Sequence, residues 1–337
     1  MQFMKQKINK GEIMKKILTI QDISCVGQCS LTVALPIISA MGIETAIIPS
    51  AVLSTHTGGF SGYTFRDLTE DLPLISNHWQ KEQITFDGIY TGYIGSTKQI
   101  EYIKDIIDAF KQNNLVVVVD PAMADHGKLY YGFDDEFVGK MRTLIEKADY
   151  IVPNITEACF LTNTPYFEEY TKEDIEKLLI KLSELGPNHV VLTGISFDAN
   201  KLGAAMYDKT TNEFKYYFNE RVPLLFHGTG DIFASSFFGA IINGLDMYEA
   251  SKVAVDFTLE AIKHTIDDAN EHWYGVHFEK ADINYTGAFT VINQMFAKDI
   301  PEEFVYVNEP TRKNLAEGLP LNFFVNRGEN YKEIIRK

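Results

Sequence analysis

Residues 115–121 read Leu-Val-Val-Val-Val-Asp-Pro, the clearest strand signal in the chain. An uninterrupted β-branched run between a helical segment and a proline-marked loop is typical of a strand buried on both faces of a parallel sheet. We therefore place this strand at the centre of a sheet. Asp120 ends it, and ligands bind beyond the carboxyl ends of strands in open α/β sheets.

Strand-like and helix-like segments alternate on both sides of this run, from Ile17 to Ile266. The other strand signals lie at Ile17–Ile20, Glu44–Pro49, Phe86–Ser96, Asp149–Pro153 and His189–Gly194. The alternation predicts a three-layer α/β/α domain with a mostly parallel sheet. Residues 203–220 alternate as two strands around a hairpin at 209–213, which predicts an antiparallel edge.

Helices are expected at 31–38, where Pro36 could introduce a bend, and over the amphipathic segment 245–266. Residues 60–83 are polar and helical in pattern, with a break at Pro73. Residues 21–30 are expected to form a loop.

The composition excludes several classes of protein. The 337 residues carry a net charge of -15, and 45% of them are hydrophobic. Lysines scattered among acids do not suggest a nucleic-acid or anionic-membrane surface, and no apolar span of membrane length is present. Cys25, Cys29 and Cys159 are too few for a disulfide framework, so we expect a reducing, cytoplasmic location. Cys25 and Cys29 are expected to be buried thiols rather than metal ligands.

A glycine-rich turn at Gly228-Thr229-Gly230-Asp231 stands between an apolar run and small, apolar residues at helical spacing. The glycines should therefore begin a helix, whose first N–H groups and macrodipole favour a phosphate. A carboxylate beside a phosphate is repelled unless it has a task, such as accepting a proton from an attacking hydroxyl. Asp231 could also be an ordinary cap residue.

Together with Asp120-Pro121-Ala122-Met123-Ala124-Asp125 and Asn154-Ile155-Thr156-Glu157, this turn resembles the ribokinase-type small-molecule kinases, and among them the pyridoxal/pyridoxine kinases. The resemblance covers roughly residues 16–280. It implies that Gly228, Thr229 and Gly230 cradle the transferring phosphate. It also implies that Asp231 is the base that activates the substrate hydroxyl.

The same resemblance assigns the nucleotide and metal residues. It places Asp120 and Asp125 near the phosphates and cations, Asn154 with ATP, and Glu157 with Mg²⁺ through water. Thr193 and Gly194 are implied to contact the phosphates, and residues 126–132 to form a flap over ATP. Asn154 to Glu157 is also a capping-box pattern, and a single acid after a strand could merely cap a turn.

Substrate residues are implied in three loops. Asp22 stands where the family usually has a serine near the pyridine ring, with Ser24 close by, and both could instead cap the following helix. His56 and Thr57 match the family's substrate loop, although a solitary histidine is more often a structural residue. Tyr93 matches a tyrosine near the substrate ring, although it could be a packing residue.

The implied reaction is phosphoryl transfer from ATP to the 5′-hydroxymethyl group of a B6 vitamer. Mg²⁺ is expected, a monovalent cation such as K⁺ is left open, and a homodimer is implied. The nearest alternative is a hydroxymethylpyrimidine kinase of thiamine synthesis. A non-catalytic vitamin- or nucleotide-binding protein on the same fold is another. A Rossmann dehydrogenase is disfavoured because no Gly-x-Gly-x-x-Gly follows the first strand.

The domain organisation follows from these patterns. Residues 14–280 form the kinase-like domain, residues 1–13 a polar tail, and residues 281–337 an extension of unassigned role. Translation could begin at Met1 or at Met14.

Overall fold

The computed structural model describes residues 14–281, except 113, 225 and 269–271. The predicted tail at 1–13 lies outside these described residues, and so does the predicted extension apart from residue 281. No helix of the described part is long and apolar enough to cross a bilayer.

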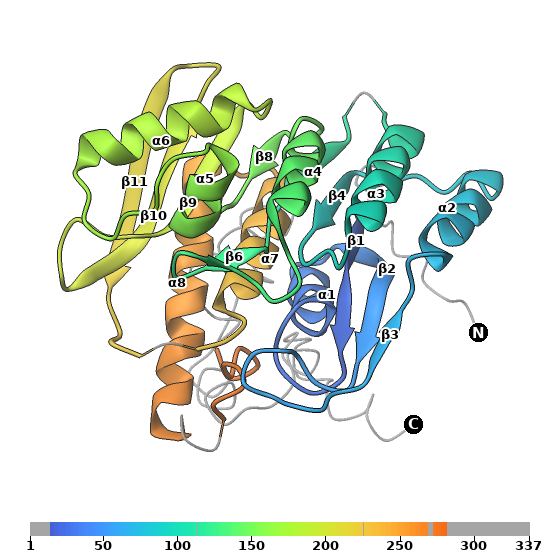
Figure 1. Cartoon of the computed structure of the whole chain (residues 1–337), viewed down its shortest axis with the longest axis horizontal. Coiled ribbons are helices and arrows are strands. Elements are labelled where there is room, and N and C mark those ends of the chain that lie inside the picture. Colours follow the sequence, from blue (N-terminus) through green and yellow to red (C-terminus); the bar gives the residue numbers. More distant parts are fainter. Residues whose placement is uncertain (1–13, 113, 225, 269–271, 282–337) are drawn as a thin grey trace, which may run out of the picture. The chain divides into compact units, whose positions relative to one another are not determined.

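A nine-stranded sheet has the order β11-β10-β9-β8-β5-β4-β1-β2-β3 (Figure 1). Its parallel strands are β1 (Lys16–Ser24), β2 (Glu44–Leu53), β4 (Gly88–Thr91), β5 (Val116–Val119), β8 (Tyr150–Ile151) and β9 (His189–Ile195). The antiparallel strands at its two edges are β10 (Lys201–Asp208), β11 (Glu213–Glu220) and β3 (Phe65–Asp67). The β10–β11 hairpin confirms the predicted antiparallel edge.

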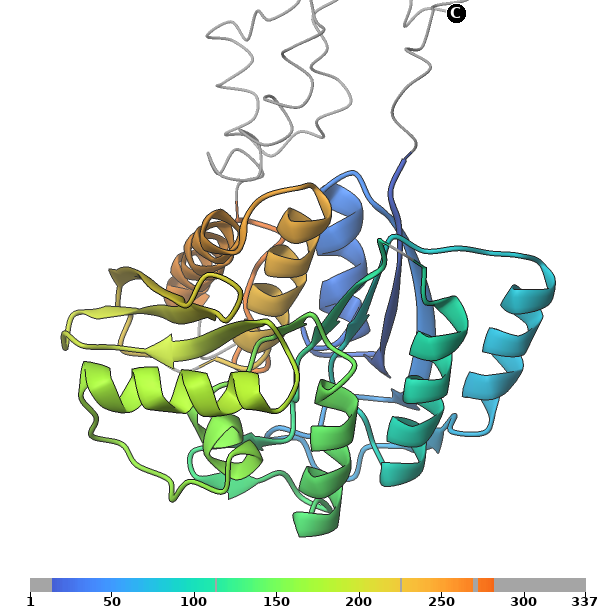
Figure 2. The same ribbon diagram turned by 90° about the horizontal axis from the view of Figure 1, so that it is seen from above.

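Helices cover both faces of the sheet (Figure 2). One face carries α1 (Leu31–Ala40), α7 (Thr229–Ile242) and α8 (Met247–Thr265), which runs on into a short 3₁₀ turn at Ile266–Asp268. The other face carries α2 (Asp71–Lys81), α3 (Thr97–Phe110), α4 (Asp135–Ile145), α5 (Ile155–Leu161) and α6 (Lys172–Glu184). The three-layer α/β/α prediction is therefore confirmed.

The central position of β5 follows from its sequence. Val117 and Val119 pack into the core on the α3 and α4 side, whereas Val118 packs into the core on the α7 side. Successive side chains of a strand point to opposite faces, so a strand covered on both faces needs an unbroken apolar run. Burying each such side chain contributes about 1.5–3 kcal/mol. β5 has four strands on either side in this sheet, as predicted.

Helix α7 is buried along nearly its whole length, because every residue from Ile232 to Ile242 is buried. A helix that is apolar or small on all sides can be satisfied only between other elements. It packs against α1 and α8 as well as the sheet. Its amino end is thereby held at a fixed place.

Strand β1 is longer than predicted, since it continues through Ser24. The loop expected from residue 21 therefore begins only after the strand, and a register irregularity lies between Gln21 and Ile23. The N-cap residue, directly before α1, is Ser30, and its side chain makes no capping hydrogen bond. Asp22 and Ser24 consequently do not cap the following helix.

Pro73 does not break a helix. Residues 60–64 are irregular and β3 follows them, so the helix α2 begins only at Asp71. Pro73 therefore lies in the first turn of α2. Backbone N–H groups of a first turn have no partner within the helix, which makes proline acceptable there. Pro36 lies inside α1.

The segment predicted as a flap, 126–132, supplies the turn and the second strand of a two-stranded hairpin, β6 (Ala124–Asp125) and β7 (Lys128–Leu129). His126 and Gly127 form its turn with positive φ values of 49° and 74°. The Gly127 N–H donates to the Thr156 hydroxyl at 3.1 Å, which ties the turn to α5.

Candidate active site

The amino end of α7 is built around Gly228. This residue precedes the helix with a φ of 79°, in the left-handed region that favours glycine. A Cβ at Gly228 would lie 1.8 Å from the Gln28 carbonyl oxygen, so the loop after β1 touches the backbone there. A Cβ at Gly230, in contrast, would meet nothing within 4 Å. The Cβ direction of Gly230 is therefore open, and the free N–H groups of a first helical turn are of the kind that favour an anion.

Asp231 lies in that first turn. The pKa of its carboxyl is raised from 3.8 to about 8, chiefly by burial and also by the nearby Asp120 and Asp22 carboxylates, while a hydrogen bond from the Ser30 N–H opposes the shift. The carboxyl is thus close to balance between its two protonation states. A group of this kind suits a general base acting near neutral pH.

Two more buried acids lie at the ends of neighbouring strands. Asp120 follows β5, Glu157 is in the first turn of α5, and their exposed fractions are 8% and 2%. Burial raises the pKa of Asp120 well above its usual value, and Glu157 raises it further. Burial raises the pKa of Glu157 to about 7, although three backbone N–H groups oppose this shift.

The Asn154–Glu157 motif does form a capping box. The Glu157 N–H donates to the Asn154 side chain at 2.9 Å, and the Asn154 N–H donates to Glu157 Oε2 at 2.9 Å. The other Glu157 oxygen accepts from the Met123 N–H at 2.9 Å, and Asn154 Nδ2 donates to the Ala124 carbonyl at 2.8 Å. The motif thus fixes Glu157 beside the segment after β5, whatever else the carboxylate does.

The acid pair fits a divalent cation. Asp120 and Glu157 offer oxygen atoms as ligands. Their pKa values are raised because their negative charges are buried near each other, and no lysine or arginine is among the groups that act on them. Among the described residues no three His, Cys, Asp or Glu side chains could hold a metal ion by themselves. A Mg²⁺ ion here would therefore need further oxygen atoms from water or a nucleotide, which is usual for this ion.

Asp125 lies outside the buried pair. Its side chain is 53% exposed, accepts from the His126 N–H at 2.8 Å and stands 3.5 Å from His126 Nε2. Tyr130, in the loop after β7, was not predicted as a site residue. Burial raises the pKa of its phenol, and Glu157, Asp125, Asp120 and Asp231 raise it further, so Tyr130 is near all four acids. Its place inside the predicted flap was the available signal.

Thr193 and Gly194 lie near the end of β9, the strand beside β8. Thr193 forms an isolated parallel β-bridge with Asn154, and the Thr193 N–H donates to the Pro153 carbonyl at 2.9 Å. Gly194 has a φ of 70° and open space where a Cβ would stand. The structure therefore brings these two residues next to the Asn154–Glu157 motif.

Asp22 and Ser24 lie at the carboxyl end of β1 and are buried. The Ser24 hydroxyl donates to Asp22 Oδ2 at 3.0 Å. Tyr93 follows β4, and burial, Asp22 and Tyr63 raise its pKa to about 12. The structure thus brings Asp22, Ser24 and Tyr93 together on the Asp231 side of the site, because Asp22 also acts on the pKa of Asp231.

His56 is buried, and both of its ring nitrogens already have protein partners. Nδ1 accepts from the Gly58 N–H at 3.1 Å, so Nε2 carries the proton and donates to the Tyr274 carbonyl at 2.8 Å. Burial lowers its pKa, which keeps the ring neutral. The nitrogens are therefore not available to a substrate in this structure, whereas Thr57 is exposed.

The rings around His56 join distant loops. Its centroid lies 5.0 Å from Phe60, 5.1 Å from His227 and 6.5 Å from Trp273. His227 immediately precedes the Gly228–Asp231 turn, so this aromatic cluster connects the loop after β2 to the start of α7. The sequence had singled out His56 but not these partners, which lie far apart along the chain.

The loop after β1 supplies Cys29 and Ser30, which the sequence analysis missed as site residues. Burial, Asp231 and Asp22 raise the pKa of the Cys29 thiol well above its usual value. Cys25 is exposed and Cys29 is half-buried, so the prediction that both thiols are buried is wrong for Cys25 and only partly right for Cys29. The strand ends only after Ser24, which leaves Cys25 in the outer part of the loop.

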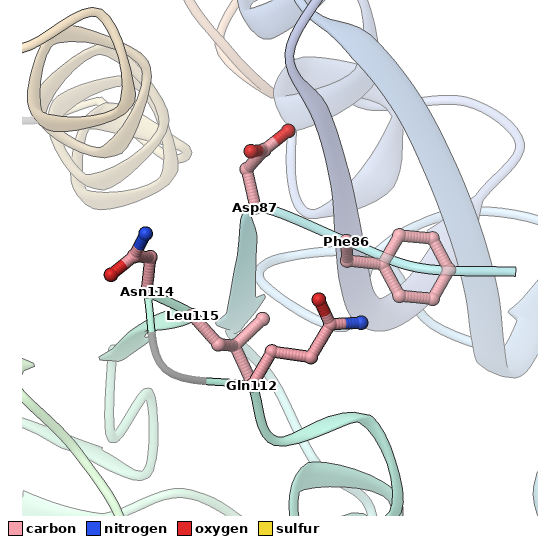
Figure 3. Close-up of a pocket in the computed structure, with 5 residues that line it drawn as sticks. All are labelled: Phe86, Asp87, Gln112, Asn114 and Leu115. Carbon is pink, nitrogen blue, oxygen red and sulfur yellow. The ribbon is translucent and has the colours of Figure 1, made fainter.

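A crevice of about 480 Å³ lies elsewhere, before β4 and β5, and is lined by Phe86, Asp87, Gln112, Asn114 and Leu115 (Figure 3). These residues are at the amino ends of the strands. The acids described above are at or beyond the carboxyl ends. Because ligands of open α/β sheets bind at the carboxyl ends, the crevice is not the candidate active site.

Comparison with known proteins agrees with this geometry. Residues 63–275 match the family described as Phosphomethylpyrimidine kinase. A candidate phosphomethylpyrimidine kinase of Bacteroides thetaiotaomicron VPI-5482, solved in an orthorhombic form with pyridoxal, is 36% identical. It covers 83% of this chain and 96% of its own, with a TM-score of 0.77.

Two further relatives are called pyridoxal kinases. The structure of the Lactobacillus plantarum enzyme is 32% identical and covers 84% of this chain and 99% of its own, with a TM-score of 0.75. The Dictyostelium discoideum enzyme is 29% identical over 74% of this chain and 86% of its own length. The expected ribokinase-like fold is confirmed, and this chain belongs to the phosphomethylpyrimidine kinase family of ATP-dependent, ribokinase-like kinases.

Proposed function

We propose that this protein is a pyridoxal, pyridoxine and pyridoxamine kinase, which transfers a phosphoryl group from ATP to the 5′-hydroxymethyl group of B6 vitamers in pyridoxal 5′-phosphate salvage. The observation that carries the proposal is the place of Asp231. It stands in the first turn of α7, and its pKa is raised to about 8 by burial and by the nearby Asp120 and Asp22 carboxyls. A base so placed can serve an alcohol next to a bound phosphate.

Each part of the site has one task in this reaction. Asp231 accepts the proton of the attacking hydroxyl. The N–H groups of Gly228, Thr229 and Gly230 bind the transferring phosphoryl group, where glycine allows close approach. Catalysis then consists mainly of positioning and charge stabilisation, as is usual in phosphoryl transfer.

The nucleotide side is assigned to Asp120, Asp125, Asn154, Thr193 and Gly194. Asp120 and Glu157 would hold Mg²⁺, which when bound neutralises charge on the phosphate oxygens. These two acids have no cationic partner among the described residues, so without a bound metal ion they would repel the polyphosphate of ATP. This need for a cation supports the assignment of Mg²⁺. A monovalent cation such as K⁺ stays a prediction.

The vitamer side is assigned to Asp22, Ser24 and Tyr93, with Thr57 in the exposed loop. His56 was expected to contact the vitamer, but its two engaged nitrogens support a different role. We infer that it positions the loops around the substrate. A homodimer and a cytoplasmic location also stay predictions, and light scattering of the purified protein tests the first.

Hydroxymethylpyrimidine kinase is the second candidate. The description of the matching family favours it, and it would use the same phosphate-handling residues. The loops around Asp22 to Ser24 and around His56 and Thr57 are the places where the two substrates should be told apart. A non-catalytic binding protein is disfavoured, since a pure binder gains nothing from a partly buried, uncompensated base.

The test is turnover by the purified protein with MgATP and four alcohols in parallel: pyridoxal, pyridoxine, pyridoxamine and hydroxymethylpyrimidine. ADP release and the mass of the product are measured. We expect phosphorylated B6 vitamers, with a higher kcat/KM than for the pyrimidine. Phosphorylation of the pyrimidine alone would establish the second candidate. If none of the four alcohols led to ADP release, both candidates would be overturned.

A further inference from the structure

Residues 272–281, at the end of the described chain, pack beside the start of α7, and we call them the C-terminal strap. The His277 N–H donates to the Thr265 hydroxyl at 2.8 Å, which fixes the strap to the end of α8. Three of its apolar side chains share a buried cluster with Ile232 of α7: Val276, Phe278 and Ala281. The strap is therefore anchored to the helix that carries Asp231.

The strap also contacts the loop after β2. The Tyr274 carbonyl accepts from His56 Nε2 at 2.8 Å, and the rings of Trp273 and Phe60 have centroids 4.6 Å apart. Because the same strap touches the loop after β1 as well, it connects two loops that lie beside the candidate active site.

Gln28 makes the contact with the loop after β1, and it lies between two glycines. A Cβ at Gly228 would stand 1.8 Å from the Gln28 carbonyl oxygen, and a Cβ at Gly275 would stand 2.7 Å from the Gln28 Cβ. Both distances are shorter than side-chain atoms tolerate, so both positions require glycine. The backbone of Gln28 thus touches the residue before α7, while its side chain touches the strap.

Glu279 of the strap holds the Gln28 side chain. Gln28 Nε2 donates to both carboxylate oxygens of Glu279, at 2.8 Å each, although 251 residues separate the two along the chain. Only the amide nitrogen can donate to a carboxylate, so this contact sets the orientation of the Gln28 amide. The contact is exposed, and an exposed hydrogen bond contributes little to the stability of a fold.

The loop that Gln28 belongs to also carries a group that acts on the base. Two residues further on, the Ser30 N–H hydrogen-bonds Asp231. The Thr32 hydroxyl donates to the Gly27 carbonyl at 3.1 Å and to the Cys29 carbonyl at 2.8 Å, which makes residues 27–30 one compact turn. A shift at Gln28 is therefore passed on to the Ser30 N–H.

We propose that Glu279 is a positioning residue, which acts through Gln28 to keep the loop after β1 against the start of α7, so that Asp231 and the phosphate-binding turn stay aligned. The proposal rests on the proposed function and adds to it a group outside the site. Small displacements of reacting groups can lower a rate by up to about 10²-fold, so a contact of little weight in folding can have a large weight in catalysis.

The test uses the full-length protein with four changes at this contact: Glu279→Ala, Glu279→Gln, Gln28→Ala and the double variant Gln28→Ala/Glu279→Ala. Glu249→Ala is the matched control, since it removes an exposed glutamate of α8 that pairs with Lys252 instead. The substrate is the alcohol that the wild-type protein phosphorylates best. The readouts are kcat, the KM for ATP, the dependence of kcat on pH, and the melting temperature.

We expect Glu279→Ala to lower kcat about tenfold, with the KM for ATP and the melting temperature close to those of the wild type. Glu279→Gln should recover most of this loss, because its amide oxygen can still accept from Gln28. The double variant should be no slower than the slower single variant, since both changes remove one contact. The control should match the wild type.

The pH dependence separates positioning from a general loosening of the fold. The Ser30 N–H opposes the rise in the pKa of Asp231, so a weaker bond raises that pKa further. The rising limb of kcat against pH should therefore move to higher pH in Glu279→Ala and stay in place in the control. Asp120 and Asp22, the other charged groups that act on Asp231, are unchanged in every variant.

Four results would overturn the inference. They are a wild-type kcat and pH profile in Glu279→Ala, an equal loss in Glu279→Gln, losses of the two single variants that multiply in the double variant, or a loss accompanied by a lower melting temperature. Turnover of a B6 vitamer by the wild type together with any of them leaves the proposed function standing. A wild-type protein that phosphorylates none of the four alcohols removes both proposals.

Discussion

The two ends of the parallel strands treat acidic residues in opposite ways. At the amino ends, Asp87 accepts from the Lys16 N–H at 2.8 Å and pairs with Lys15 Nζ at 3.3 Å. Asp149 accepts from the Val117 N–H at 2.8 Å, which links β8 to β5. These acids have close donors and connect neighbouring segments of the fold, and Asp87 is also one of the residues that line the crevice of Figure 3.

At the carboxyl ends, Asp22, Asp120, Glu157 and Asp231 have raised pKa values, and burial is the largest cause for each. None has a lysine or arginine among the groups that act on its pKa. Grouping uncompensated acids costs folding free energy. The difference teaches that an acid held by donors at the edge of the fold reports on structure, whereas a cluster of buried acids without a cationic partner marks the place where a ligand supplies the positive charge.

The largest expected effect is at Asp231. Asp231→Asn should lower kcat by about 10²- to 10⁴-fold, the usual contribution of a general base. ATP binding should be retained or tightened, because a negative charge next to the phosphates is removed. Steady-state kinetics and calorimetric titration with ATP check the two parts. A variant of near-normal rate would show that Asp231 is not the base.

Next in size is Glu157→Gln. Glutamine can keep the capping box, so helix α5 should stay intact. The half-saturating Mg²⁺ concentration should rise about 10- to 100-fold, the usual result of disturbing groups that support a metal. Activity is titrated with Mg²⁺ at fixed ATP, and thermal melting serves as the control. An unchanged Mg²⁺ dependence would reduce Glu157 to a capping residue.

The pH dependence of stability provides the third prediction. The folded pKa of Asp231 is about 8, against 3.8 for an ordinary aspartate. Between those values the folded state retains a proton that the unfolded state has released, so stability falls as pH rises. Ligand-free Asp231→Asn should lack this loss and be about 1–3 kcal/mol more stable than wild type near pH 8.

Urea unfolding at pH 5 and at pH 8 measures this difference. The stability advantage of Asp231→Asn should shrink toward pH 5. The wild-type carboxyl is then protonated in the folded state, and the pH lies closer to the pKa of 3.8 in the unfolded state, so less stability is lost. A gap that is constant between the two pH values would mean that the charge of Asp231 is not the source.

The smallest effect is expected at the amino ends. Asp87→Asn should cost less than about 1 kcal/mol in the free energy of unfolding, because its ion pair with Lys15 is solvent-exposed. Turnover should match the wild type. A marked loss of activity in this variant would erase the distinction between the two ends of the sheet.

Much of the fold could be predicted because its signals are local. The valine run gave the central strand, and the glycine turn before a run of small residues gave the start of α7. Boundaries were less certain: β1 continues through Ser24 because pairing with β2 extends that far. Pro73 was taken as a break because its acceptability depends on where the helix begins.

The site divides in the same way. Asp231, Asp120, Glu157 and Asn154 could be found because each follows a strand or begins a helix in a recognisable motif. His56 was found, but its engagement by Gly58 and Tyr274 was not, since Tyr274 lies 218 residues away along the chain. Ser30 was not singled out, and nothing in its neighbours along the chain indicated that it lies near two acids.

The sequence by itself determined the alternation of strands and helices, the centre of the sheet and the glycine turn that starts α7. These depend on side-chain periodicity and on glycine, which act over a few residues. Only the tertiary structure decided that Asp22, Ser30 and Asp231 come close together, and that the loops after β1 and β2 meet the start of α7. Such contacts arise from packing between segments far apart in the chain, where the pattern of neighbouring residues carries no information.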